Sequence, residues 1–280
     1  MDKKILNIKG INFSEGMPKI CISIMGQTKE EVLDNAKAVL SSNPDLVEWR
    51  ADYLEALKTA ADLESKQWLV AIKPVVEDIL AALREIMGEK VIVFTFRSKE
   101  EGGESHLDME QYIELNKLAV DSGKVDIIDV EAFRGVDMNS SEAAPKAADF
   151  VSSLVDYAHQ KEVKVIGSRH YFEETPEQQR MVEVLMALQY ADVDMPKLAV
   201  MPKTAGDVAR LIDATQEMNA RFADRPIITM SMAEEGMVSR FMGEAFGSAV
   251  TFASVGKASA PGQINAEGLR MLLELVHSEL

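Results

Sequence analysis

The sequence is short of cysteine, histidine and basic charge, and each shortage excludes a class of protein. Cys21 is the single cysteine, so no internal disulfide can form. Four histidines and one cysteine leave little from which to build a structural zinc site. Lysine and arginine total 30 against 46 aspartates and glutamates, a net charge of −16. That balance argues against nucleic-acid binding, which needs clustered basic side chains.

The chain also lacks a long apolar run, and its first residues do not predict a secretory leader. Its apolar runs are far shorter than the roughly 20 residues that a membrane-spanning helix needs. Met1-Asp2-Lys3-Lys4 is not followed by the apolar segment and small-residue cleavage site of a signal peptide. We therefore expect a cytoplasmic globular protein with neither a membrane nor a nucleic acid as partner.

Short apolar runs that alternate with helical patterns are what the sequence does contain. Most runs are rich in Val, Ile or Phe, as is typical of parallel strands buried on both faces. The runs are Ile20–Ile24, Leu46–Arg50, Val91–Arg97, Asp126–Glu131, Val163–Ser168, Lys197–Met201, Ile227–Ser231 and Ala249–Phe252. Eight such runs in 280 residues predict an α/β fold, a (β/α)8 TIM barrel forming one catalytic domain over residues 1–280.

An open doubly wound sheet is the alternative architecture. It is disfavoured because Ile24-Met25-Gly26-Gln27 stands where a Gly-x-Gly-x-x-Gly phosphate loop would follow the first strand. Residues 3–14 alternate around Gly10 and predict a β-hairpin that precedes the barrel. Residues 132–143 predict an enlarged loop after the fourth strand. Helix starts are indicated at Thr28, Thr175 and Thr204, and near Asp108.

Chemically reactive side chains gather at the carboxyl ends of the predicted strands, where a barrel places its active site. Glu48 and Arg50 are two residues apart and so share a face of their strand. The remaining candidates at these ends are Arg97, Asp129, Glu131, His170, Lys197, Arg240 and the segment Ser259–Gln263.

Lys197 is the most informative candidate, because it stands inside an apolar strand. A buried ammonium costs several kcal/mol unless it is paired or neutral, and proteins often respond by lowering its pKa. A neutral amine near cations such as Arg50, Arg97 and Arg240 could form an imine with a carbonyl substrate. Spacing alone favours a simpler alternative, in which Lys197 starts the strand and extends to solvent.

His170 follows a strand end, where an imidazole could transfer protons near neutral pH or serve only as a hydrogen-bonded structural residue. His106, His159 and His277 fall in or beside helical patterns and are expected at the surface. Cys21 is expected to be a small buried hydrophobic residue.

Several strings together resemble the type I 3-dehydroquinate dehydratase family over nearly the whole chain. They are Ile20–Ser23, Val47–Asp52, Phe94–Arg97 with Glu101–Gly103, Ser168–His170, Pro196–Pro202, Gly247–Phe252 and Lys257–Ile264. The resemblance implies a hydro-lyase of the shikimate pathway, and so of aromatic amino-acid biosynthesis. The reaction is the syn dehydration of 3-dehydroquinate to 3-dehydroshikimate through a lysine imine. It requires no cofactor and no metal, and a homodimer is usual for the family.

The resemblance also implies roles for individual residues. Lys197 matches the imine-forming lysine, His170 the general acid and base, and Glu101 the carboxylate beside that histidine. Asp129 is a second candidate for orienting His170. The implied substrate-binding residues are Ser23, Glu48, Arg50, Arg97, Arg240, Ser259 and Gln263, with Arg240 and Gln263 around the substrate carboxylate and Glu48, Arg50 and Arg97 around its hydroxyls.

Two alternatives and two departures stay open. A lysine-dependent aldolase on the same barrel would also use Lys197. The other alternative is a non-catalytic barrel that binds metabolites or partners, and the co-occurrence of Lys197, His170 and Glu101 argues against it. Tyr171 stands where the family often has an aspartate after the catalytic histidine, so a contact to His170 could differ. The loop after the fourth strand is longer than expected for the family.

Overall fold

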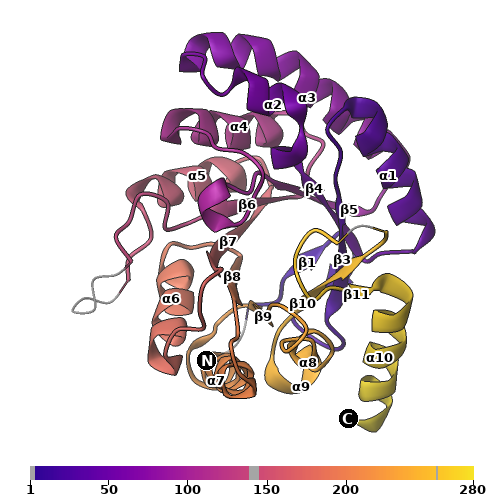
Figure 1. Cartoon of the computed structure of the whole chain (residues 1–280), viewed down its shortest axis with the longest axis vertical. Helices are drawn as coiled ribbons and strands as arrows, with labels where there is room; N and C mark the ends of the chain where they lie inside the picture. The colour runs from indigo at the N-terminus through magenta and orange to yellow at the C-terminus, as the bar shows by residue number, and fades with distance from the viewer. Residues whose placement is uncertain (1–3, 139–144, 257) are drawn as a thin grey trace.

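The computed structural model describes residues 4–138, 145–256 and 258–280. Its centre is a parallel sheet curled into a ring (Figure 1). The strands are β3 (Lys19–Ile24), β4 (Leu46–Arg50), β5 (Val91–Thr95), β6 (Ile127–Glu131), β7 (Lys164–Tyr171), β8 (Met195–Val200), β9 (Ile228–Ser231) and β10 (Val250–Ser254). They pair in chain order and β10 pairs with β3, while a parallel bridge between Ile227 and Ser248 joins the two remaining edges. The predicted (β/α)8 barrel is confirmed.

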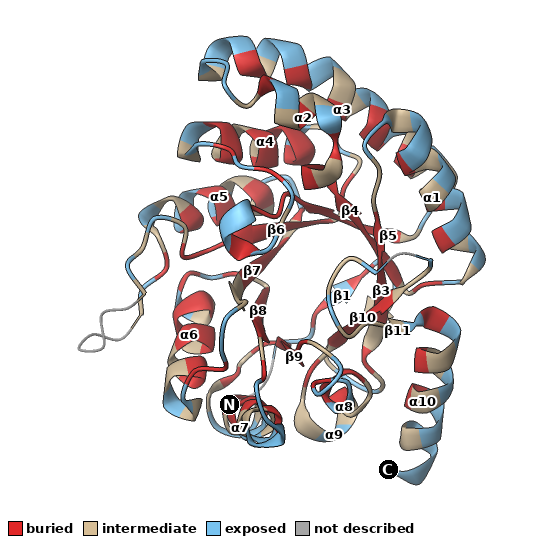
Figure 2. Ribbon diagram, viewed as in Figure 1, coloured by how far each residue is buried: buried red, intermediate tan, exposed pale blue. Residues whose placement is uncertain are grey.

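Helices surround this ring, with their buried faces turned toward the strands (Figure 2). They are α1 (Lys29–Ser41), α2 (Glu55–Ala60), α3 (Ser65–Met87), α4 (Met109–Asp121), α5 (Asp149–His159), α6 (Gln178–Tyr190), α7 (Ala205–Glu217), α8 (Val238–Phe241), α9 (Gly243–Phe246) and α10 (Ala266–Glu279). Within the described ranges, no helix is long and apolar enough to cross a membrane. Part of the predicted enlarged loop, residues 139–144, lies outside the described residues.

Three of the predicted helix starts are confirmed by their caps. The hydroxyls of Thr28 and Thr204 and the carboxylate of Asp108 each accept a backbone N–H three residues on. The fourth was wrong, because α6 begins after Glu177 and the Thr175 hydroxyl donates instead to the carbonyl of Met201.

The predicted hairpin is also confirmed, as β1 (Asn7–Ile8) and β2 (Ile11–Asn12). Lys9 and Gly10 make its turn with φ of 48° and 83°, the left-handed conformation that a two-residue hairpin turn requires. Leu6, Ile8 and Phe13 pack against the first inward side chains of the barrel, Cys21 among them. The hairpin thus covers the amino-terminal end of the barrel, and Cys21 is a buried apolar side chain as predicted.

Successive side chains of each strand point alternately toward the helices and into the barrel, so the protein has two hydrophobic cores. In β5, Ile92 and Phe94 pack with the helices, whereas Val91 and Val93 fill the barrel interior. The next inward position is Thr95, which is polar. The same change from apolar to polar occurs toward the carboxyl ends of β4, β6 and β7, so polar groups collect at that end of the barrel.

Candidate active site

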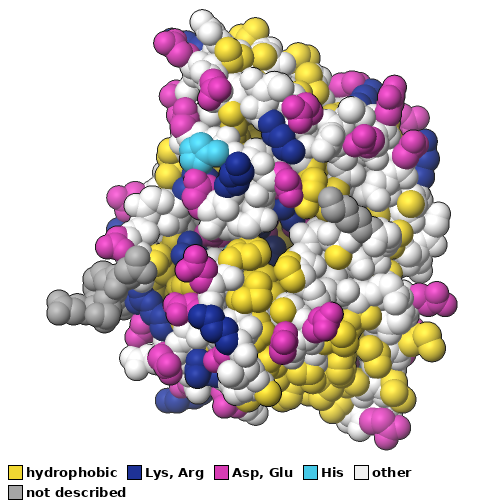
Figure 3. Space-filling model, viewed as in Figure 1, with side chains coloured by type: hydrophobic (Ala, Val, Ile, Leu, Met, Phe, Trp, Pro, Cys, Tyr) yellow, Lys and Arg dark blue, Asp and Glu magenta, His cyan; other side chains and the backbone are white. Residues whose placement is uncertain are grey.

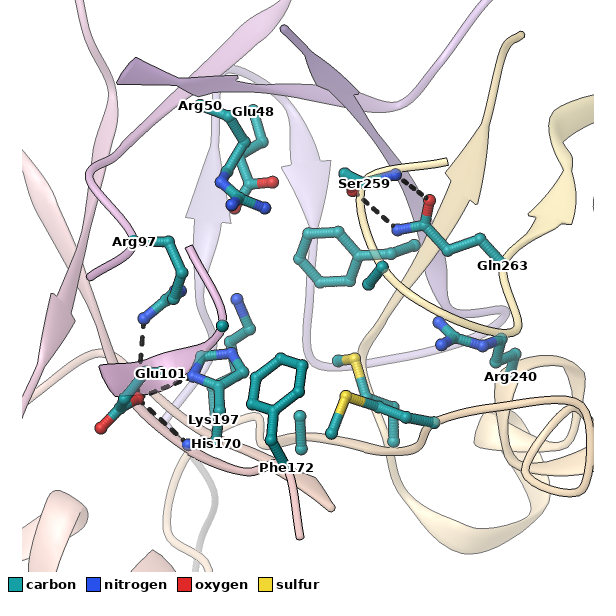
Figure 4. Close-up of a pocket in the computed structure, with 16 residues that line it drawn as sticks. Glu48, Arg50, Arg97, Glu101, His170, Phe172, Lys197, Arg240, Ser259 and Gln263 are labelled. Carbon is teal, nitrogen blue, oxygen red and sulfur yellow. Dashed lines mark hydrogen bonds and ion pairs between the residues drawn. The ribbon is translucent and has the colours of Figure 1, made fainter. Parts of the chain in front are cut away.

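A cavity at the carboxyl end of the barrel brings together most of the predicted site residues (Figure 4). Arg97, Glu101 and His170 line one side, and Arg240, Ser259 and Gln263 lie across from them. Figure 3 shows the same face hollowed near its centre, where hydrophobic and basic side chains meet. The lining residues that were predicted are Glu48, Arg50, Arg97, Glu101, His170, Lys197, Arg240, Ser259 and Gln263. Ser23 contributes through its hydrogen bonds to Glu48 and Ser259.

Lys197 is the third residue of β8 and is 3% exposed, so the alternative in which it extends to solvent was wrong. Its Nζ lies 2.7 Å from Oδ2 of Asp129 and 4.7 Å from the centre of the Phe252 ring. The buried charge is therefore met by a carboxylate rather than left among cations. Asp129, the second candidate for orienting His170, is hydrogen-bonded to Lys197, whereas the partner of His170 Nδ1 is Glu101.

Asp129 is also held by Arg97 and Ser168. Arg97 Nη2 donates to its Oδ1 at 2.7 Å and the Ser168 hydroxyl at 2.6 Å. Burial opposes ionisation of Asp129, but Arg97 and Lys197 hold its pKa well below the usual range. Arg97 Nη1 also donates to Glu131 at 3.1 Å. This network fixes the direction of the lysine amine.

His170 lies beside Glu101, which comes from the short helical turn Lys99–Glu101 (η2) after β5. Oε2 of Glu101 is 2.8 Å from Nδ1 of His170 and accepts the His170 backbone N–H at 3.1 Å. Burial, Arg97 and Lys197 lower the pKa of His170 well below its usual value, although Asp129 opposes them. The imidazole is therefore neutral near pH 7, and the Glu101 contact leaves its Nε2 as the second ring nitrogen available to a substrate.

A chain of polar contacts forms another wall. Glu48 accepts hydrogen bonds from the hydroxyls of Ser23 at 2.6 Å and Thr95 at 2.9 Å. Ser23 Oγ is 2.9 Å from Ser259 Oγ, and Ser259 and Gln263 bond to each other through two hydrogen bonds. The strand β4 is thereby linked to the loop between β10 and β11 (Ile264–Asn265).

The three arginines of the cavity differ in their partners. Arg50 makes two hydrogen bonds to Asp52, and Arg97 binds Asp129 and Glu131. Arg240 is 1% exposed, and its one hydrogen bond among the described residues goes from Nη2 to the Pro261 carbonyl. Its Nε and Nη1 are buried without a partner there, and burial lowers its pKa to about 10. Within the described ranges, Arg240 is therefore a cation without a carboxylate partner.

Apolar lining residues were not predicted. Met230 lies in β9, Met232 directly after it, and Phe252 in β10. Each is two residues beyond an inward apolar side chain, Ile228, Met230 and Val250 respectively, and this period of two could have found them. Phe172 closes the cavity beside His170, with the two rings stacked 6.4 Å apart. Its ring lies directly against Gly102, whose φ of +83° and missing side chain allow this approach.

Known proteins match this chain along almost its full length. A sequence model of the type I 3-dehydroquinase family matches residues 20–279. A 3-dehydroquinate dehydratase of Salmonella agona (strain SL483) is 44% identical over 274 residues, 98% of this chain and 99% of that protein. The equivalent protein of Salmonella typhimurium (strain LT2) shows the same identity and coverage.

Solved structures agree with the sequence matches. A type I 3-dehydroquinate dehydratase from Clostridium difficile, with covalently modified comenic acid, is 39% identical with a TM-score of 0.87 and covers 99% of this chain and 100% of that one. The 3-dehydroquinate dehydratase from Geobacillus kaustophilus HTA426 is 31% identical with a TM-score of 0.86 and coverage of 99% and 98%. These relatives are dehydratases, so the aldolase alternative is not supported. The chain belongs to the type I 3-dehydroquinase family and is a hydro-lyase of the shikimate pathway acting on 3-dehydroquinate.

Proposed function

We propose that the dehydration proceeds through an imine on Lys197, with His170 as the group that moves protons. The amine adds to the ketone carbon and water leaves as the protonated imine forms. His170 removes a proton from the neighbouring carbon, and the electron pair forms an enamine. The enamine expels the hydroxyl with a proton from His170, a syn elimination, and water then releases 3-dehydroshikimate from the lysine. The net change is the loss of one water.

The observation that carries this proposal is the position of the two groups in one buried cavity. Lys197 and His170 occupy inward positions on two neighbouring strands, β8 and β7, and both line the same pocket. The iminium is an electron sink that makes a weak carbon acid easier to deprotonate. The covalently modified ligand of the Clostridium difficile relative gives independent support, since that family member undergoes covalent chemistry with a small molecule.

Asp129 serves the imine in two ways in this proposal. Its contact at 2.7 Å orients the lysine Nζ toward the cavity before attack. Its carboxylate, held ionised by Arg97, then balances the positive charge of the iminium without any rearrangement of the site. Attack requires a neutral amine, so the ammonium must lose a proton before the ketone reacts.

Substrate recognition follows from the partners that the cavity leaves open. The unpaired N–H groups of Arg240 are suited to the carboxylate of 3-dehydroquinate, with Gln263 beside it. Across the cavity from Arg240, hydrogen bonds to Ser23, Asp52 and Asp129 fix the side chains of Glu48, Arg50 and Arg97. In these positions the three side chains can bind the substrate hydroxyls. We also propose a cytoplasmic homodimer, each chain forming one catalytic domain.

The direct test is an ultraviolet assay for the conjugated enone of 3-dehydroshikimate during incubation of the protein with 3-dehydroquinate. Absorbance should rise in proportion to protein concentration without added metal or nicotinamide. A protein that leaves 3-dehydroquinate unchanged under these conditions would contradict the proposed activity.

Changing Arg240 to alanine is expected to raise KM for 3-dehydroquinate by about 10- to 100-fold, with kcat changed much less. The reason is that a hydrogen bond to a charged group contributes about 1.5–3 kcal/mol, and this contact exists before and during the reaction. Steady-state kinetics of Arg240→Ala measure the effect. Arg221→Ala is the control and should keep its KM, because this exposed arginine lies in the short helical segment Met218–Phe222 (η3) and does not line the cavity. A fall in kcat alone would reassign Arg240 to the chemical step.

The pH dependence of kcat is expected to reflect the lowered pKa of His170. Only the neutral imidazole can accept the proton, so kcat should fall as pH drops through the pKa of His170 in the bound complex. Because burial and nearby cations lower that pKa, the fall should lie below pH 6.5, the usual value for histidine. A profile measured between about pH 5 and 8 checks this. A fall centred above 6.5 would assign the acid limb to Glu101, whose pKa burial and Glu131 raise to about 8, and not to the imidazole.

A further inference from the structure

Arg169 contacts Glu101, the partner of His170, from outside the substrate cavity. In β7, Ser168 and His170 point into the barrel, so the intervening Arg169 starts on the opposite face. Its side chain, 21% exposed, nevertheless turns toward η2, and Nη1 donates to Oε1 of Glu101 at 2.9 Å. Arg169 lies outside the cavity that holds the substrate groups, because it is not among the residues that line it. Its contact with the site is made through Glu101.

The two oxygens of Glu101 therefore have different partners. Oε2 faces the His170 backbone N–H and Nδ1, and Oε1 faces the Arg169 guanidinium (Figure 4 shows the His170 side). The backbone N–H and the guanidinium can only donate hydrogen bonds, so both favour an ionised carboxylate. An ionised Glu101 in turn keeps the imidazole proton on Nδ1 and leaves Nε2 free to accept a proton from the substrate.

Tyr171 holds Arg169 in this position. The guanidinium carbon lies 4.8 Å from the centre of the Tyr171 ring, within the range of a cation–π contact. Tyr171 is the residue that departs from the family pattern after the histidine. Its side chain contacts Arg169, and through Arg169 it supports Glu101.

We propose that Arg169 is a positioning residue for proton transfer by His170, acting through Glu101 to fix the charge and direction of that carboxylate. The inference rests on the proposed role of His170 and extends it to a residue outside the cavity. It assigns a function to the Arg169–Tyr171 pair on the outer face of β7.

The charges that surround the pair explain why Glu101 needs this support. Glu101 faces Arg97 from β5 at 3.8 Å, Glu131 from β6, and Arg169 and His170 from β7. Burial and Glu131 raise the pKa of Glu101 to about 8, and Arg97 and Arg169 keep it from rising further. His170 also faces Arg97, Lys197, Asp129 and Arg50. Arg97 is shared with Asp129 and Glu131. Within the part of the chain that the structure describes, Arg169 is the arginine whose carboxylate contact is with Glu101 alone.

Removing the guanidinium should therefore leave Glu101 protonated at a higher pH than in the parent protein. A protonated Glu101 donates to Nδ1 and moves the ring proton to Nε2, which can then no longer accept a proton. In Arg169→Met we expect kcat to fall by about 10²-fold at about pH 8, near the pKa of Glu101 in the parent, within the contribution of positioned acid–base catalysis. The acid limb of the kcat profile should move to higher pH than in the parent, and activity should recover as pH rises.

Three further variants distinguish a role of Arg169 in positioning Glu101 from a role in folding alone. Arg169→Lys keeps the charge and should restore most of the kcat and the original acid limb. Arg169→Gln keeps an N–H donor without the charge and should behave like Arg169→Met, which provides the test again if the methionine variant unfolds. Arg210→Met removes a partly exposed arginine of α7 whose ion pair is with Asp207, and it should leave kcat and the pH profile unchanged.

A double substitution tests whether the effect passes through Glu101. In the Glu101→Gln background, Arg169→Met should cause little additional loss, because the carboxylate on which it acts is absent. Losses that multiply, or an Arg169→Met profile identical to the parent, would overturn the inference. These results are distinguishable from failure of the proposed function, in which His170→Ala would itself keep normal kcat.

Discussion

Replacement of Lys197 by alanine is expected to lower kcat on 3-dehydroquinate by on the order of 10⁴- to 10⁶-fold, the range seen when a covalent nucleophile is removed. Among the described residues that line the cavity, Lys197 is the one lysine, so no neighbouring amine can replace it. The variant should still bind the substrate, since Arg240 and Gln263 are retained. Asp129 keeps its bonds to Arg97 and Ser168, so we expect the variant to fold.

Chemical trapping tests imine formation by Lys197 in the parent protein. Borohydride added during turnover should reduce the imine and leave a stable mass adduct on the peptide that contains Lys197. Lys203→Ala, which removes an exposed lysine just beyond the end of β8, should keep full activity and the adduct. Retained turnover in Lys197→Ala, or an adduct on a different lysine, would exclude Lys197 as the imine-forming residue.

Local patterns in the sequence predicted most of the barrel because each strand is buried on both faces. The run Leu46–Arg50 coincides with β4, and the caps at Thr28, Asp108 and Thr204 mark real helix starts. Such signals depend on neighbours within a few residues, so they can be read without knowing the fold. The helix start predicted at Thr175 was wrong because its hydroxyl donates to the carbonyl of Met201, a residue distant in the sequence.

Contacts between side chains of different strands in the site could not be predicted from local patterns. Lys197 and Asp129 are 68 positions apart in the sequence. They meet because β6 and β8 both pair with β7, in registers that place Asp129 beside Ile166 and Lys197 two residues further along, beside Ser168. The β8 strand also begins two residues before its predicted start, which moves the lysine from its end to its buried middle. These facts belong to the pairing of strands and not to any one segment.

The surroundings of Glu101 show the same limit. The family resemblance placed Glu101 near His170, and the structure brings them to 2.8 Å. The approach of Arg169 depends on η2 turning over the end of β7, and no spacing in the sequence contains that information. Tyr171 was noted as a departure, but its contact with Arg169 could be recognised only in three dimensions.

Replacement of His170 by alanine is expected to separate imine formation from elimination. The Lys197–Asp129 pair is intact in this variant, so the amine should still react with the ketone. Removal of the proton from the adjacent carbon should fail, and kcat should fall by about 10²- to 10⁴-fold, the usual contribution of a positioned acid–base group. The enzyme should therefore accumulate as a covalent complex with substrate that has not lost its hydroxyl.

Mass spectrometry of the borohydride-trapped protein distinguishes the two stages. In His170→Ala the adduct should carry the mass of the reduced substrate imine, whereas the parent should also show the adduct that is lighter by one water. His106→Ala removes an imidazole that is exposed and bound to Glu100, and it should behave as the parent does. Product formation at the normal rate in His170→Ala would show that another group transfers the proton. Loss of the adduct itself would instead place His170 in the formation of the imine, before the carbon acid is deprotonated.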